Sequence, residues 1–463
     1  MALISRFRWL TRTLIALTAA MLFTLTSTAL AFASPGGITL LQLSSDPYTN
    51  NTSQHQTEVE PDSFSFGSTI VSAFQVGRFY NGGSSNIGWA TSTDSGKSWT
   101  NGFLPGTTVY ATPAGSYARI SDPAVAYDAA HHTWIISSLA ISSNIAPAVL
   151  VSLSTDGGMT WSTPLSVVNA AKTNFDKDWI ACDNTSTSKF YGHCYVEWDV
   201  SSSSQLIEMS TSTNGGLVWS PPQATASQTD GIGGQPLVQP NGTVIVPISN
   251  PPFTQLLSFV STDGGASWSS TVVAAQTPFY TEEAKIRTGF QSAAMDGSGK
   301  VYVVWSGCSF ESSCTANDLI MSTTTDGTDW STPQLIPVDP VGSGVDHIIP
   351  ALAVDATTSG SSAHLALTYY YFPNASCSTN TCQLNVGYVS STDGGKTWSA
   401  KTQLAGPMML TWLANTTSGF MVGDYVGASI VHGLAFPIIA VATPPAKQTL
   451  NEAIYTVAGG LQV

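Results

Sequence analysis

The stretch STDGGKTW at residues 391–398 decides the fold, because close copies of it recur along the chain. Its Asp carboxylate and Ser hydroxyl can bind backbone N–H groups of a turn, and its glycines adopt a conformation that other residues resist. The tryptophan then packs over the turn. We therefore interpret these aspartates as structural turn residues, not as catalytic groups or calcium ligands. The other copies are STDSGKSW at 92–99, STDGGMTW at 154–161, STNGGLVW at 212–219, STDGGASW at 261–268 and the shorter TTDGTDW at 324–330.

Each turn joins the last two strands of a longer unit. An alternating apolar segment precedes it, as in QLLSFVS at 255–261, and a short polar strand follows. Upstream lies a second recurring pattern of an apolar strand, a turn and a more hydrophobic strand, as in FQSAAMDGSGKVYVVWSG at 290–307. Four antiparallel strands per unit predict the blades of an all-β fold, a β-propeller.

The upstream pattern occurs seven times, once more than the turn. The additional copy is GFMVGDYVGASIVHGLAFPIIAVA at 419–442. We predict seven blades, with six as the alternative. The last blade lacks an outer strand, and ITLLQLS at 38–44 is expected to supply it and close the ring.

The first residues have the features of an export signal. Arg6, Arg8 and Arg12 precede an apolar run that ends in Ala31-Phe32-Ala33, a small-x-small cleavage pattern. We predict a signal peptide at 1–33 and a single propeller domain at 34–463, with a membrane anchor as the alternative for the leader. The protein is then secreted, without a membrane partner after cleavage.

Charge and cysteine content narrow the class of protein. Without the three leader arginines, 12 basic residues face 29 acidic ones, so the formal charge is near −17 and nucleic acid is a poor partner. The six cysteines occur as close pairs, which in an exported chain predicts local disulfides and not a metal site. No motif for a cofactor is present, and we expect a monomer. The pairs are Cys182 and Cys194, Cys308 and Cys314, and Cys377 and Cys382.

With STDGGxTW turns spaced by whole blades, the chain resembles the Asp-box, or BNR-repeat, propellers of the sialidase superfamily. This resemblance covers nearly all of the chain after the leader. It implies an exo-glycosidase of the exo-α-sialidase type that acts on an extracellular glycan or glycoprotein. Because the same repeats also occur in non-catalytic propellers, the alternative is a BNR propeller that only binds a glycan or a protein.

In such a propeller the site lies on the face opposite the turns, where the first strand of each blade begins. Arg78, Arg119 and Arg287 all fall on that face. The resemblance implies that they clamp a substrate carboxylate, since a guanidinium matches a carboxylate in bidentate fashion. It further implies catalytic roles for Asp122 as the acid, Tyr425 as the nucleophile, and Glu282 or Glu283 as its helper.

Two departures keep the non-catalytic alternative open. The family's Phe/Tyr-Arg-Ile-Pro segment is absent, the nearest text being Ala118-Arg119-Ile120-Ser121, and no arginine follows Arg287. The same residues can also form structural ion pairs. The candidate pairs are Arg119 with Asp122, Arg78 with Glu58 or Glu60, and Arg287 with Glu283.

Overall fold

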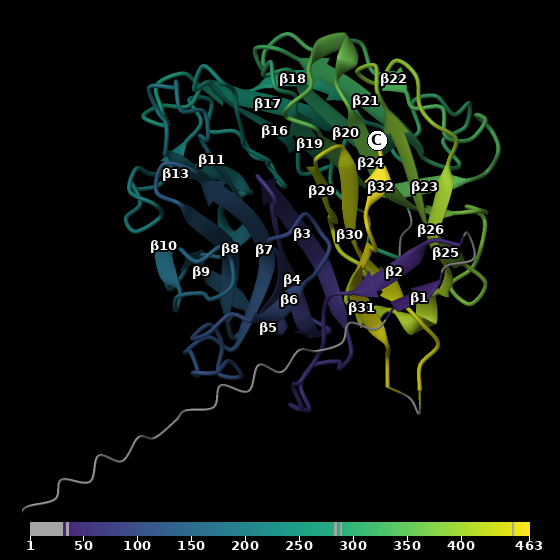
Figure 1. Ribbon diagram of the computed structural model, residues 1–463, viewed down its shortest axis with the longest axis horizontal. Coiled ribbons are helices and arrows are strands. Elements are labelled where there is room, and N and C mark those ends of the chain that lie inside the picture. Colours follow the sequence, from purple (N-terminus) through teal and green to yellow (C-terminus); the bar gives the residue numbers. More distant parts are fainter. Residues whose placement is uncertain (1–30, 34–36, 282–284, 288, 447–448) are drawn as a thin grey trace, which may run out of the picture.

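The computed structural model describes residues 31–33, 37–281, 285–287, 289–446 and 449–463, and strands dominate this part of the chain (Figure 1). Helix is limited there to three single 3-10 turns, at Ser201–Ser203, Gly360–Ser362 and Leu410–Trp412. The predicted all-β fold class is confirmed. No helix of these residues is both long and apolar enough to cross a membrane.

Four sheets have four antiparallel strands each, in chain order, which confirms the predicted four-stranded unit. Their strands are β11 (Phe175–Cys182), β12 (Cys194–Val200), β13 (Leu206–Ser212) and β14 (Gln223–Ala224); β15 (Leu237–Val238), β16 (Val244–Ser249), β17 (Gln255–Ser261) and β18 (Val272–Gln276); β19 (Ser292–Met295), β20 (Val301–Gly307), β21 (Asp318–Thr324) and β22 (Gln334–Leu335); and β23 (Asp346–Val354), β24 (Leu365–Phe372), β25 (Gln383–Ser391) and β26 (Thr402–Met409).

An eight-stranded sheet contains two more units of the same kind. A single residue pair, Ser84 opposite Ile120, joins them. Their strands are β3 (Glu58–Phe66), β4 (Thr69–Arg78), β5 (Ser84–Ser92) and β6 (Thr100–Phe103), then β7 (Arg119–Asp128), β8 (Thr133–Ser142), β9 (Ile145–Ser154) and β10 (Leu165–Asn169).

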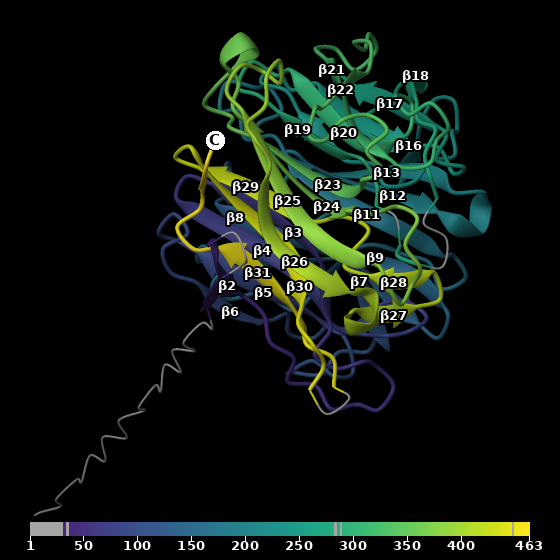
Figure 2. The same cartoon turned by 90° about the vertical axis from the view of Figure 1, so that its right-hand side faces the viewer.

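The last unit combines the two ends of the chain. β29 (Gly427–Val431), β30 (Leu434–Ala442) and β31 (Glu452–Val457) follow one another, and β2 (Thr39–Gln42) pairs antiparallel with β31 (Figures 1 and 2). The segment 38–44 thus lies beside the last unit, as the sequence predicted. Three short additions were not predicted. β1 (Ala31–Ala33) pairs with β2, β32 (Leu461–Gln462) pairs with β30, and β27 (Ala414–Thr416) forms a hairpin with β28 (Gly419–Met421).

The first strands of the units contact one another in chain order. β3 contacts β7, then β7 contacts β11, and the series continues through β15, β19, β23 and β29; β29 in turn contacts β3. Apolar side chains fill the space between neighbouring sheets. Val71 and Ile87 of one unit, for example, pack with Val125 and Trp134 of the next, and all four are buried.

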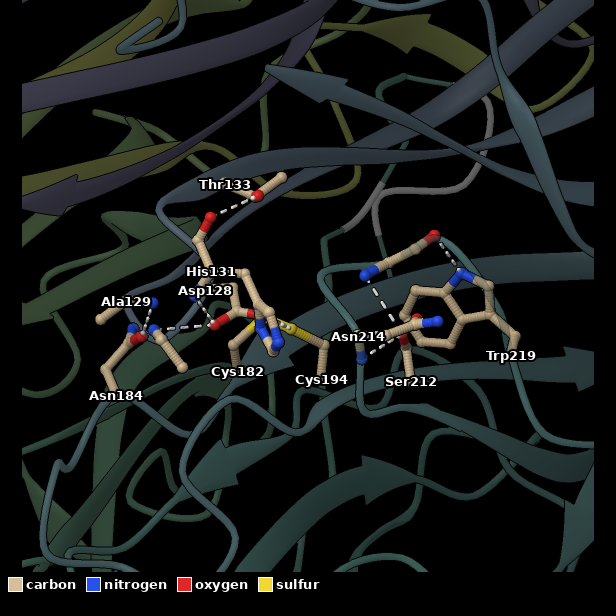
Figure 3. Close-up of a disulfide and its surroundings, with 12 residues drawn as sticks. Asp128, Ala129, His131, Thr133, Cys182, Asn184, Cys194, Ser212, Asn214 and Trp219 are labelled. Carbon is tan, nitrogen blue, oxygen red and sulfur yellow. Dashed lines mark hydrogen bonds and ion pairs between the residues drawn. A yellow bond between two sulfur atoms is a disulfide. The ribbon is translucent and has the colours of Figure 1, made fainter. Parts of the chain in front are cut away.

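The recurring turns have the predicted structural role. In the copy at 154–161, the Ser154 hydroxyl donates to Asp156 Oδ1 at 2.8 Å and accepts the Gly158 N–H at 3.0 Å. Asp156 Oδ1 also accepts the N–H of Thr160 at 2.9 Å. The third copy keeps this pattern with an amide in place of the carboxylate, because Asn214 Oδ1 accepts from the Ser212 hydroxyl (Figure 3).

The three predicted local disulfides are confirmed. Cys182–Cys194 joins opposite residues of β11 and β12 (Figure 3), while Cys308–Cys314 and Cys377–Cys382 close loops between the second and third strands of their units. The leader's predicted cleavage site coincides with β1, and residues 1–30 lie outside the described part of the chain.

Candidate functional site

A cavity of about 250 Å³ lies near the starts of the first strands, and eight of its 22 lining residues are charged. All three arginines that the sequence analysis placed on one face line this cavity. Its charged residues are Glu60, Arg78, Arg119, Asp122, Asp176, Lys177, Arg287 and Asp424.

β-Bulges bring three of these side chains to the cavity. The register of β3, β7 and β11 shifts at Glu60, Asp122 and Lys177, whose φ angles are 57°, 50° and 48°. β23 has the same shift at Ile349, where φ is 50°. A bulge inserts one residue and redirects its side chain, and the left-handed conformation costs a non-glycine residue about 1–2 kcal/mol. The same distortion thus recurs at equivalent places in four units.

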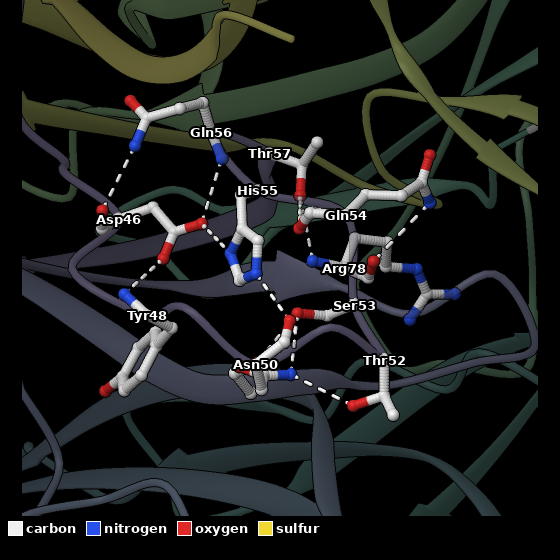
Figure 4. Close-up of polar contacts among 11 residues, drawn as sticks. Asp46, Tyr48, Asn50, Thr52, Ser53, Gln54, His55, Gln56, Thr57 and Arg78 are labelled. Carbon is white, nitrogen blue, oxygen red and sulfur yellow. Dashed lines mark hydrogen bonds and ion pairs between the residues drawn. The ribbon is translucent and has the colours of Figure 1, made fainter. Parts of the chain in front are cut away.

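Arg78 is held at the wall of the cavity by its backbone and its side chain. Its N–H donates to the Thr57 hydroxyl at 2.9 Å and its carbonyl accepts the Gln54 N–H (Figure 4). One guanidinium nitrogen, Nη1, donates to Gln75 Oε1 at 2.8 Å and to the Gly83 carbonyl at 3.1 Å. Burial, followed by the charge of Arg287, lowers the pKa of Arg78. The two guanidinium groups are therefore electrostatic neighbours.

Arg287 forms a bidentate ion pair with Asp424. Its Nε donates to Asp424 Oδ1 at 2.8 Å, and its Nη2 donates to Asp424 Oδ2. Burial disfavours the charge of Arg287, but Asp424, Glu60 and Asp122 outweigh burial and raise its pKa. Among the contacts of the described residues, Nη1 of Arg287 and Nη2 of Arg78 have no hydrogen-bond acceptor.

Arg119 is engaged differently. Its Nη1 donates to the Asn81 carbonyl at 3.2 Å, the Asn81 side chain at 2.9 Å and the Gly82 carbonyl at 2.6 Å, while Nη2 donates to the Ser143 carbonyl. The guanidinium thus ties two loops together. The alternative pairing with Asp122 is not found, and Arg78 likewise forms no ion pair with Glu58 or Glu60. Loop carbonyls and the side chain of Gln75 accept the hydrogen bonds that those carboxylates were expected to accept.

Tyr425 packs against Lys177, a residue of the cavity lining, and is only 3% exposed. Its hydroxyl donates to the Pro123 carbonyl at 2.8 Å, and burial raises its pKa well above the usual value. Lys177 Nζ lies 3.5 Å from the centre of its ring, with the rings of Trp179 and Phe290 at 5.4 and 5.5 Å. The phenol is therefore neutral in this arrangement. Its predicted role as a nucleophile stays a prediction.

Two carboxyl groups of the cavity have raised pKa values. Burial, and then Asp122, raises the pKa of Glu60 to about 8 and that of Asp176 to about 6. Burial also raises the pKa of Asp178 and Glu197, which do not line the cavity, well above the usual range. Burial and the neighbouring carboxylates both disfavour the ionised form of these groups, so several of them are protonated at neutral pH.

Two of the predicted catalytic residues lie outside the part of the chain that the structure describes. Glu282 and Glu283, and with them the pairing of Arg287 with Glu283, lie outside the described residues. No group of three or more His, Cys, Asp or Glu side chains within the described ranges could hold a metal ion.

Four charged residues of the cavity were not predicted as site residues: Asp176, Lys177 and Asp424 were given no role, and Glu60 was considered only as an ion-pair partner of Arg78. A signal was available, since charged residues precede a proline in Glu60-Pro61 and Asp122-Pro123 at the start of a predicted first strand. Asn81, Asn144 and Asn174, which also line the cavity, carry no such signal.

Copies of the recurring turn lie within segments that match known protein families. A BNR repeat-like domain matches residues 146–349, and a BNR/Asp-box repeat matches residues 389–400. The chain contains BNR/Asp-box repeats. The resemblance inferred from the turn is thereby confirmed. No curated protein matches this BNR-repeat protein.

Several solved structures resemble the BNR-repeat protein at low sequence identity. A Hadza microbial sialidase is 13% identical, with a TM-score of 0.46 over 85% of this chain and 73% of its own. The NanB sialidase from Streptococcus pneumoniae is 13% identical, with a TM-score of 0.45 over 90% and 70% of the two chains. A protein of unknown function from Dyadobacter fermentans is 14% identical, with a TM-score of 0.48 over 77% and 100%. Values this low do not define a substrate.

Proposed function

We propose that the protein is a secreted, seven-bladed propeller at 34–463, released from a signal peptide at 1–33 and closed by its N-terminal strand. The cyclic order of contacts among the first strands and the pairing of β2 with β31 support this architecture. Three disulfides fit an oxidising compartment. N-terminal sequencing of secreted protein tests the cleavage, and a mature chain that begins far from residue 34 contradicts it.

We further propose that the central cavity binds an acidic terminal sugar of an extracellular glycan and that the protein hydrolyses its glycosidic bond, as an exo-glycosidase of the sialidase type. One observation carries this proposal. Arg78 and Arg287 are electrostatic neighbours in one cavity, and each keeps a guanidinium nitrogen without an acceptor among the described residues. Two such groups suit a carboxylate, which takes up charge-assisted hydrogen bonds. Arg119, whose donors are taken by loop carbonyls, instead shapes the wall.

The cavity also holds the carboxyl groups that hydrolysis requires. A glycosidase needs one carboxyl that donates a proton and a second group that attacks or activates water. The raised pKa of Asp176, about 6, suits the donor in weakly acidic solution, and Asp122 lies beside it. We assign the acid–base role to Asp122 and Asp176 together. Tyr425 can attack only after its hydroxyl leaves the Pro123 carbonyl.

Fluorogenic sialosides and a wider panel of glycosides, incubated with the secreted protein at acid and neutral pH, test this activity. We expect release of an acidic sugar, with Asp176→Asn lowering the rate at least tenfold. Arg78→Lys should raise KM for the acidic substrate about tenfold, because an ammonium lacks the planar set of donors that lets Arg78 bind Gln75 and Gly83 with one nitrogen and keep another for the carboxylate. No release from any substrate at either pH would overturn hydrolysis.

The second candidate is a non-catalytic binding protein, and the buried, hydrogen-bonded hydroxyl of Tyr425 favours it. A glycan array distinguishes the two. Binding of acidic glycans without turnover supports this candidate, provided that Arg78→Ala and Arg287→Ala together abolish binding. Binding that survives both substitutions places the ligand elsewhere.

A further inference from the structure

A second, smaller pocket of about 50 Å³ lies beside the central cavity, between the unit of β15–β18 and the unit of β19–β22. It is lined by the loop between β16 and β17, by residues of 277–279 and 289–291, and by the facing ends of β20 and β21. Six of its twelve lining residues are aromatic or aliphatic, and none is charged. The residues are Ser249, Phe253, Leu256, Thr277, Phe279, Gly289, Phe290, Gln291, Trp305, Ser306, Asn317 and Ile348.

Three phenylalanines shape this pocket, and all three are partly exposed. The ring centroid of Phe253 lies 6.4 Å from that of Phe279 and 5.7 Å from that of Phe290. Burying an aromatic side chain removes about 150–250 Å² of surface from water, which favours folding. Aromatic rings that stay partly exposed on a folded protein are therefore candidates for ligand contact. Here three of them present partly open faces around one small pocket.

The loop that carries Phe253 holds its ring in a fixed place. Phe253 has a φ of 57°, a conformation that is unfavourable for a bulky side chain. Its N–H donates to the Asn250 carbonyl at 2.8 Å, and its carbonyl accepts the Thr277 hydroxyl at 3.1 Å. Asn250 Oδ1 in turn accepts the N–H groups of Thr254 and Gln255, both at 2.9 Å. The backbone that carries the ring is therefore held in place by the loop itself.

Phe290 forms part of both the pocket and the central cavity. Its N–H donates to the Asp424 carbonyl at 2.8 Å, and Asp424 is the partner of Arg287. On its cavity side, the ring faces Lys177 at 5.5 Å. A ligand held by Arg78 and Arg287 thus extends toward the pocket across a single side chain.

We propose that this Phe-lined pocket is a subsite for the second sugar of the glycan, the one bonded to the terminal sugar in the central cavity. This inference rests on the proposed function. The C–H face of a sugar ring is apolar and packs on an aromatic face, while its hydroxyls remain in water. The pocket itself holds about four water-sized groups, enough for one hydroxymethyl or acetyl substituent of that ring. It contains no charged side chain among its described lining residues, so the second sugar is uncharged.

The test compares two ligands with the same terminal sugar. Sialyllactose carries a second ring, whereas methyl sialoside carries only a methyl group. Calorimetric titration of the mature protein carrying Asp176→Asn, which slows hydrolysis of the ligand, should show that Phe253→Ala and Phe279→Ala each weaken sialyllactose binding roughly fivefold and leave methyl sialoside binding unchanged. Phe253→Leu, which keeps apolar volume but removes the flat face, should behave like Phe253→Ala. This variant guards against loss of folding.

Phe310→Ala is the matched control, since Phe310 is 39% exposed on the same side of the molecule, in the Cys308–Cys314 loop. It should leave both affinities unchanged. Equal effects of Phe253→Leu on the two ligands, or none on either, would overturn the subsite. If the unsubstituted protein binds neither ligand, the proposed function fails instead, and the subsite for a sialoside fails with it.

Discussion

At the scale of single residues, burial decides how much free energy of unfolding is lost when one partner of an ion pair is removed. Arg287 and Asp424 pair with side chains that are 27% and 8% exposed, whereas Lys401 pairs with Asp339 from a side chain that is 40% exposed. Water screens the second pair and solvates each partner when the other is removed. The first pair leaves an uncompensated charge in a poorly solvated place.

Asp424→Asn should therefore lower the free energy of unfolding by about 3 kcal/mol, because it leaves the Arg287 guanidinium without its counterion. Lys401→Met, the control, should cost less than about 1 kcal/mol. Urea denaturation of the two variants measures both values. Equal losses would contradict the weight that burial is given.

The recurring turn offers a second contrast between residues. Ser154→Ala removes the acceptor of the buried Gly158 N–H and should cost about 1–3 kcal/mol of unfolding free energy. Asp156→Asn should cost less, since Asn214 keeps the equivalent backbone contact in the third turn, to the Val218 N–H at 3.0 Å. Thermal unfolding of both variants gives the comparison, and the reverse order would contradict the role assigned to the serine.

At the scale of elements, left-handed residues mark where strands turn or bulge. The β8–β9 hairpin has Ser142 opposite Ile145, so Ser143 and Asn144 form its turn. Ser143 has a φ of 56°, and its carbonyl accepts from Arg119. A two-residue turn with positive φ at its first central position favours glycine. This element therefore carries strain in a residue that also shapes the wall of the cavity.

Ser143→Gly should raise the free energy of unfolding by about 0.5 kcal/mol. Glycine adopts this conformation without steric cost, but part of the gain is offset because the more flexible glycine loses more conformational entropy on folding. Ser142→Gly, one residue earlier, is the control and should destabilise the protein. Chemical denaturation measures both changes. A destabilising effect of Ser143→Gly would show that the turn is not strained.

At the scale of the whole molecule, the two ends of the chain meet around two buried acids. Glu58 accepts from the Ser44 hydroxyl at 2.7 Å, and Glu452 accepts the Ala414 N–H at 2.7 Å. Each has a second carboxyl oxygen that is buried without a partner among the described residues. Burial raises the pKa of Glu58 to about 8 and that of Glu452 well above its usual value. Both carboxyls are thus protonated in the folded protein near neutral pH.

The stability of this junction should therefore fall as pH rises. A carboxyl whose pKa is raised by folding contributes fully below its unfolded value, near 4.5, and this contribution is lost as pH rises toward and through 8. Within that window, one such group changes the free energy of unfolding by about 1.4 kcal/mol per pH unit. Denaturation from pH 5 to 9 should show the decline, and Glu58→Gln should make it less steep by about 1.4 kcal/mol per pH unit between pH 5 and 8, while Glu452 and the other buried carboxyls keep the rest. An unchanged slope in Glu58→Gln would contradict this assignment.

The sequence was sufficient for the repeat, the strand order within each unit and the disulfides, but only partly for the site. It placed Arg78, Arg119 and Arg287 on one face, which follows from their position before or after predicted strands. It did not distinguish Arg119, whose acceptors are carbonyls of the loops at Asn81, Gly82 and Ser143. Backbone carbonyls carry no sequence signal, because every residue has one.

What the sequence determined by itself is local. The turn STDGGxTW closes its own hydrogen bonds within eight residues, and each cysteine pairs with its neighbour in the chain, so composition and spacing suffice. The tertiary structure alone decided which charges meet. Arg287 and Asp424 are 137 residues apart and precede units that the sheet of β23–β26 separates. They pair because Ile286 bridges directly to Phe420 and packs into the apolar core beside it, a contact that no sequence spacing predicts.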